Sequence, residues 1–87
     1  MKTEFQEWIE NIAHKNYSPL RDEIMSKCGV SRTTFASWMR GETSPDLDKR
    51  VTITFIAYNR DEQLPFRNMV IEHDEEGEIQ VRVKQNQ

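Results

Sequence analysis

The chain has little of what stabilises secreted or membrane proteins. It contains one cysteine, Cys28, in 87 residues, so no internal disulfide can form, which favours a reducing compartment. No apolar run approaches the roughly 20 residues of a membrane-spanning helix, and the N-terminus lacks the apolar segment of a signal peptide. No Pro/Gly/Ser-rich linker divides the sequence. We expect a small cytoplasmic protein without membrane contact.

Residues that carry catalysis or bind metals are also scarce. Beside Cys28 there are two scattered histidines, which suggest no nucleophile–base pair, and no glycine-rich phosphate loop is present. The run His73-Asp74-Glu75-Glu76 offers potential ligands, but adjacent turn residues rarely converge on one ion, and the spacing fits neither zinc nor calcium sites. We therefore expect no enzyme, no metal and no cofactor.

The net charge is −3, and nucleic-acid binders usually have a basic surface instead. The charge is unevenly distributed, however. Residues 1–60 hold nine basic and eight acidic side chains, a balance of +1, whereas residues 61–87 hold three basic and seven acidic ones, a balance of −4. The sequence thus divides into a nearly neutral part over 1–60 and an acidic C-terminal extension over 61–87.

Two helices are predicted before residue 30. Thr3 and Gln6 fit a capping box, and the apolar stripe after them predicts a helix to about Lys15. Ser18 is a suitable N-cap, and Pro19 suits the first position of a second helix, which Gly29 ends. The expected buried stripes are Phe5, Trp8, Ile9, Ile12 and Ala13 in the first helix, and Leu20, Ile24, Met25 and Cys28 in the second.

Two further helices are predicted between residues 31 and 59. Ser31 is the N-cap of a helix over 32–40 that Gly41 ends, with Phe35, Trp38 and Met39 on its buried side. Ser44-Pro45 repeats the cap-plus-proline signal and predicts a helix over about 45–59, although residues 51–57 also alternate as a strand would. Its expected buried arc is Leu47, Val51, Phe55 and Tyr58.

After residue 59 the pattern changes to that of a β-hairpin. Residues 69–72 and 79–84 read as strands around the turn 74–77, with Leu64-Pro65-Phe66 as an apolar anchor before them. A lone hairpin is marginal in water, so it must lean on the helices, pair with a second chain or fray. The predicted fold class is mainly α, with about four helices and a C-terminal β-hairpin.

The segment over residues 29–41 carries the functional signal. Two short helices meet there across a tight turn with Gly29 and the apolar Val30, which is the helix-turn-helix arrangement. In that arrangement the second helix enters the major groove of DNA. The outer side of the predicted second helix has two positive charges and three hydroxyls but no carboxylate: Arg32, Thr33, Thr34, Ala36, Ser37 and Arg40.

Residues 20 to 45 resemble the phage-repressor (Xre-type) helix-turn-helix family. The resemblance lies in Gly-Val-Ser-Arg-Thr-Thr-Phe, in Trp-Met-Arg-Gly-Glu-Thr and in the Ser-Pro downstream. It implies a lambda-repressor-like helical bundle that binds DNA. Met25 departs from the family, which often has a small residue there, and the segment after Asn59 does not match it.

The resemblance also implies roles for individual residues. The base-reading positions are Arg32, Thr33, Ser37 and Arg40. The phosphate-contacting positions are Arg21, Ser31, Thr34, Thr43 and Ser44, with Arg21 opening the second helix. Arg32 is the leading candidate, because a guanidinium can bind guanine O6 and N7 together.

Two functions follow as hypotheses. The first is sequence-specific binding of double-stranded DNA by a small transcriptional regulator, acting as a homodimer whose candidate contact is the strand edge over 79–84. The second is a protein-interaction adaptor, or an inhibitor whose acidic tail mimics nucleic acid. The two hypotheses differ in salt dependence and in whether the outer face of residues 32–40 is open.

Overall fold

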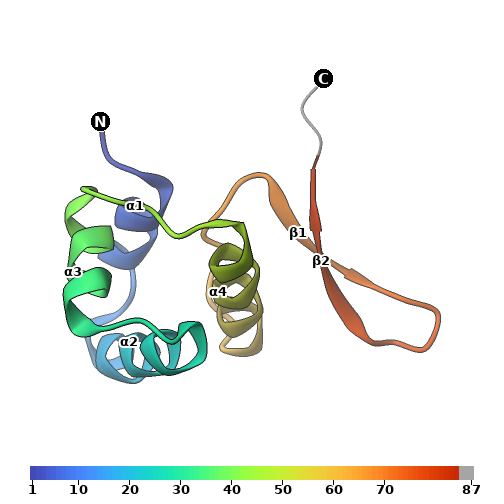
Figure 1. Ribbon diagram of the computed structural model, residues 1–87. Coiled ribbons are helices and arrows are strands. Elements are labelled where there is room, and N and C mark those ends of the chain that lie inside the picture. The colour runs from blue at the N-terminus through green and yellow to red at the C-terminus, as the bar shows by residue number, and fades with distance from the viewer. Residues whose placement is uncertain (85–87) are drawn as a thin grey trace.

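A computed structural model describes residues 1–84 (Figure 1). Its helices are α1 (Glu4–Glu10), α2 (His14–Cys28), α3 (Arg32–Arg40) and α4 (Leu47–Asn59). Its strands, β1 (Met69–His73) and β2 (Ile79–Val83), pair antiparallel. The predicted class, mainly α with four helices and a C-terminal hairpin, is confirmed. Within the described residues, no helix combines the length and apolar character needed to cross a membrane.

An aromatic cluster holds α3 against α1. The Phe5 ring lies 5.8 Å from Phe35 and 5.7 Å from Trp38, both edge-on, and 5.8 Å from Trp8. Edge-to-face packing at such distances adds to the gain from burial, and all four side chains are buried. The expected burial of Phe5, Trp8, Phe35 and Trp38 is confirmed.

The first helix is shorter than predicted and the second is longer. α1 ends at Glu10 instead of Lys15, and α2 begins at His14, so Ser18 is not an N-cap and Pro19 lies inside the helix. Proline there removes a backbone donor and would normally favour a break. Tyr17 packs against the core, and its hydroxyl donates to Met39 Sδ at 3.0 Å, which favours helix before Pro19.

The fourth helix buries a different face from the one predicted. Leu47 is 56% exposed, and Val51, Phe55 and Tyr58 are only half-buried. Apolar residues surround α4 on several sides, and the helix packs against α2 on one side and the hairpin on another, so one arc could not describe its burial. The residues that it buries are Ile53, Thr54, Ile56 and Ala57.

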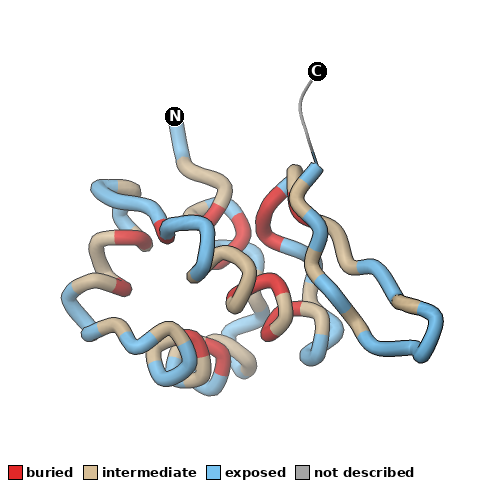
Figure 2. The backbone as a smooth tube through the Cα atoms, turned by 45° about the vertical axis from the view of Figure 1, so that its right-hand side comes forward, coloured by how far each residue is buried: buried red, intermediate tan, exposed pale blue. Residues whose placement is uncertain are grey.

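The hairpin packs against the helices, which is one of the three outcomes expected from the sequence. Figure 1 shows α4 between the hairpin and the α1–α3 pair. Met69 is buried, and Val81 and Val83 pack against the same core, while the turn is exposed in Figure 2. The segment before β1 is tied to α1, because Trp8 Nε1 donates to the carbonyl of Gln63 at 2.7 Å.

Gly41, at the end of α3, should resist substitution more than Gly77 in the hairpin turn. Both have positive φ, 76° and 83°, but a Cβ on Gly41 would lie 2.7 Å from Gln6 Cδ, whereas a Cβ on Gly77 meets nothing within 4 Å. We expect Gly77→Ala to cost about 1 kcal/mol in the free energy of unfolding. Gly41→Ala should cost roughly 1 kcal/mol more, in chemical denaturation. A Gln6→Ala background should remove that excess, and equal costs without it would contradict the predicted clash.

Candidate nucleic-acid interface

The start and end of α3 are fixed by local signals in the sequence. Gly29 takes the left-handed conformation that ends α2, and the half-buried Val30 packs against the core. The Ser31 side chain then accepts a hydrogen bond from the Thr34 backbone N–H at 3.2 Å, as an N-cap does. The predicted bounds of this helix, Arg32 and Arg40, and both of its end signals are confirmed.

The outer face of α3 is open among residues 1–84. Since Phe35 and Trp38 point into the aromatic cluster, the side chains between them lie outward. Ser31, Arg32, Thr33 and Arg40 are exposed, while Thr34, Ala36 and Ser37 are half-buried. Over the same residues, Arg32 has no ion pair and no hydrogen bond from its guanidinium. Arg32 therefore presents an uncompensated cation on the first turn of α3.

The loop after α3 returns to the outer face. Ser37 Oγ and Thr43 Oγ1 lie 2.8 Å apart and share a hydrogen bond, and the Glu42 N–H donates to the Ser37 carbonyl at 3.0 Å. A predicted base-reading residue and a predicted phosphate-contacting residue are thus brought together. Their hydroxyls form one polar site at the middle of the helix.

A carboxylate does reach this face, contrary to the expectation from the helix alone. Glu42 accepts two hydrogen bonds from Arg40, at 2.9 Å from Nε and 3.1 Å from Nη2. This bidentate hydrogen bonding lowers the pKa of Glu42 and raises that of Arg40. Glu42 lies just beyond the helix end, so a count restricted to the helix missed it. The acidic residue two positions after Arg40 was the available signal.

Arg21 does not open the second helix. Because α2 begins at His14, Arg21 lies well inside it, with its Nε 3.2 Å from Asp22 Oδ1. Its guanidinium carbon is 5.7 Å from the centre of the Tyr17 ring, in a cation–π contact. Arg21 is therefore held by its own helix and is not at a helix N-terminus.

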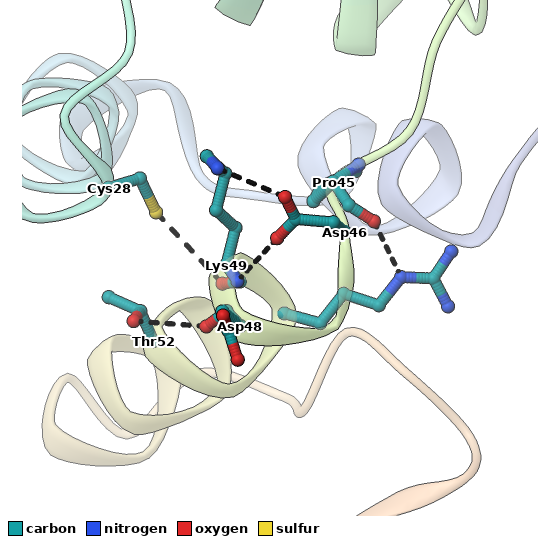
Figure 3. Close-up of polar contacts among 7 residues, drawn as sticks. Cys28, Pro45, Asp46, Asp48, Lys49 and Thr52 are labelled. Atoms are coloured by element: carbon teal, nitrogen blue, oxygen red, sulfur yellow. Dashed lines mark hydrogen bonds and ion pairs between the residues drawn. The ribbon is translucent and has the colours of Figure 1, made fainter.

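The N-cap of α4 is Asp46, whose contacts with Lys49 are drawn in Figure 3. Ser44 is exposed and is not the N-cap. Asp46 accepts from the Lys49 backbone N–H and from Lys49 Nζ, both at 3.1 Å. The backbone bond and then the ammonium lower the pKa of Asp46. Asp46, two residues after Ser44, thus caps α4 in place of the Ser44 predicted from Ser44-Pro45.

Comparisons with known proteins do not extend this description. No family model, no curated protein and no solved structure matches the chain. The functional inference therefore comes from the exposed residues of α3 and the loop that follows it.

The pairing of Arg40 with Glu42 predicts a pH dependence. Glu42 should titrate below the ordinary pKa of a glutamate, because its charged form is hydrogen-bonded. The pair is then fully formed above the ordinary pKa and is lost as the pH falls through the lowered one. Carboxyl NMR of the intact chain measures this directly.

Arg40→Gln should return the pKa of Glu42 toward its ordinary value. Lys49→Gln is the matched control, since it removes the cation beside Asp46 and should raise the pKa of Asp46 without moving that of Glu42. An ordinary pKa for Glu42 in the unmodified protein would refute the pairing.

Proposed function

We propose that this protein binds double-stranded DNA sequence-specifically through α3, with α2 and α3 acting as a helix-turn-helix, and that it is a small cytoplasmic transcriptional regulator. The observation that supports this proposal most strongly is that α3 presents several hydroxyls and Arg32, which has no ion-pair partner in the described part of the chain, outward, while its aromatic side chains are buried. The resemblance of residues 20–45 to phage repressors supports the same role.

The charge at the start of α3 favours an anionic partner. The N-terminus of a helix carries a partial positive charge, which acidic residues normally complement. α1 has Glu4 and Glu7 in its first turn and α4 has Asp48, whereas α2 and α3 have no acidic residue there and α3 begins with Arg32. A cation at this end is unfavourable for the isolated helix, and a phosphate or base acceptor would offset that cost.

The shape of α3 suits the major groove. An α-helix with its side chains is about 10–12 Å across, which fits a groove about 12 Å wide, and the nine residues of α3 run for about 13.5 Å. In the proposed complex Arg32 would read guanine, Thr33 and Ser37 would contact base edges, and Arg40 would leave Glu42 to reach a base. The proposed phosphate contacts are Ser31, Thr34, Thr43, Ser44 and, from within α2, Arg21.

A homodimer is the proposed assembly. In the described part of the chain the sheet has two strands, so the outer edge of β2 has no strand partner there. Such an edge can pair with its copy across a two-fold axis. Dimeric readers of this kind bind half-sites about 34 Å apart, and the added contacts compensate for a charge balance of only +1 over residues 1–60.

The protein-interaction alternative also has an observation in its favour. Asp74, Glu75, Glu76 and Glu78 lie in the hairpin turn, and none forms an ion pair within residues 1–84. That turn could bind a basic protein surface or mimic nucleic acid. In that case the partner would contact the hairpin and not α3.

Binding to a random-sequence duplex, followed by fluorescence anisotropy, separates the two functions. We expect binding at about 50 mM salt that weakens roughly 10³-fold by about 200 mM, because phosphate contacts release counterions. On a selected sequence, Arg32→Ala should lower affinity roughly 10- to 100-fold and relax the preference at one base pair.

Matched variants make that result specific. Lys15→Ala removes an exposed cation that is equally unpaired among residues 1–84, but on α2, and should have little effect. Glu42→Gln should strengthen binding by releasing Arg40. If no duplex binds even at low salt, the DNA-binding proposal fails and the adaptor is favoured.

The dimer has its own test in amide hydrogen exchange. If β2 pairs with its copy, the exchange of the amides that face outward from β2 should slow as protein concentration rises through the dimerisation range. Sedimentation should show a dimer over the same range. A monomer whose β2 amides exchange at a rate independent of concentration would exclude this contact.

A further inference from the structure

A cavity of about 610 Å³ lies at the open end of the hairpin, between the N-terminal segment, α4 and the residues that precede β1. We call it the hairpin-base cavity. Four basic residues line it: Lys2, Arg50, Arg67 and Lys84. Glu4 and Glu7 line it as well, so its wall carries a balance of +2 in a protein of net charge −3.

Most of the basic side chains that line this cavity form no ion pair within residues 1–84. Within residues 1–84, seven of the twelve basic side chains form ion pairs with acidic ones. Of the five that form none within residues 1–84, three line the cavity: Arg50, Arg67 and Lys84. Glu4 and Glu7 lower the local positive charge but form no ion pair with these cations within residues 1–84, and the Glu4 carboxylate accepts from the Arg67 backbone N–H at 2.8 Å. Unpaired positive charge is thus concentrated in one concave site.

Arg50 is held in place for binding. Its Nε donates to the Pro45 carbonyl at 2.9 Å, and its guanidinium carbon lies 5.1 Å from the centre of the buried Phe66 ring. Neither contact uses the terminal nitrogens of the guanidinium, which make no other hydrogen bond with residues 1–84. A guanidinium fixed in this way loses little freedom when it binds an oxyanion.

Asn68 supplies an independent indication. Its Oδ1 is buried and has no hydrogen-bond partner among the described residues, and Asn68 lines the cavity. Buried polar atoms are nearly always paired, so an unpaired one points to a missing partner. Turning the amide over would place its NH₂ in the same position, where it could donate to an anion.

We propose that the hairpin-base cavity binds a small phosphate-bearing ligand. Arginine forks and a lysine are side chains well suited to bind phosphate oxygens. The balance of +2 on the wall matches the charge of one phosphate group, about −1.5 to −2. The volume is within the range of small-molecule sites, about 300–1,000 Å³, and exceeds what one carboxylate needs.

This site is separate from the proposed DNA-binding face. No residue of α3 lines the cavity, and in Figure 1 α4 stands between α3, at the left, and the hairpin, at the right. One connection remains, because Arg50 bonds Pro45 in the loop that follows α3. The ligand would therefore contact a residue that also holds this loop.

Thermal unfolding of the full chain with inorganic phosphate or pyrophosphate, at ionic strength held constant with sodium chloride, tests the proposal. A ligand that binds the folded state raises Tm along a saturable curve. We expect such a curve, with a lower Kd for pyrophosphate if the natural ligand carries adjacent phosphates. Arg67→Gln and Lys84→Gln, both at exposed positions, should each raise Kd about tenfold.

Lys15→Gln is the matched control, because it removes one exposed cation outside the cavity and should leave Kd unchanged. A Tm that does not saturate, or a Kd that rises equally in Lys15→Gln, would overturn the proposal. The proposal would also be overturned if Tm rose with protein concentration but not with phosphate, and if Glu75→Gln with Glu76→Gln abolished that rise. The hairpin turn of a second copy would then be the occupant of the cavity.

Duplex binding by the same variants distinguishes a small-ligand site from a DNA contact. If Arg67→Gln weakens duplex binding more than Lys15→Gln does, the cavity belongs to a DNA contact and the small-ligand proposal fails. A saturable phosphate effect with unchanged duplex binding supports the cavity alone, and it would stand even if α3 binds no DNA.

Discussion

The orientation of α3 depends on the packing around Phe5. This ring meets Phe35 and Trp38 edge-on, and it thereby fixes which side of α3 is buried. At the far end of α3, Gly41 lies so close to Gln6 of α1 that no larger residue fits without displacing that side chain. Both contacts join α3 to α1, so the hydroxyls and arginines of the helix are left outward. The open polar face is a consequence of how the aromatic core is built.

Positive and negative charges are concentrated at separate places on this protein. The total of −3 conceals an unpaired Arg32 at one end of α3, a cationic cavity at the open end of the hairpin and an acidic hairpin turn. Glu42 moderates the other end of α3 by holding Arg40 in a bidentate pair. A DNA partner would have to replace that pair, so affinity is limited at Arg40 and depends more strongly on Arg32. Net charge alone is therefore a poor guide to what this surface binds.

Local signals made part of the structure predictable. Ser31 and Gly41 fix α3 through short-range hydrogen bonds and backbone conformation, and the alternation of apolar and polar residues over 79–84 predicted β2. The predicted start of α2 was wrong because the packing of the half-buried Tyr17 against the core outweighs the local preference of Pro19. The predicted buried face of α4 was wrong because α2 and the hairpin both pack against this helix. The cavity was not predictable, since it joins residues far apart in sequence: Lys2, Arg50, Arg67 and Lys84.

The central claim is that the outer face of α3 binds DNA. Mapping backbone amide shifts by NMR, while a selected duplex is added to the intact protein, tests it most directly. The account predicts that the largest changes fall on residues 31–40 and on Thr43, and that the hairpin turn moves little. Changes confined to the hairpin, or a duplex that leaves residues 31–40 unperturbed, would contradict it.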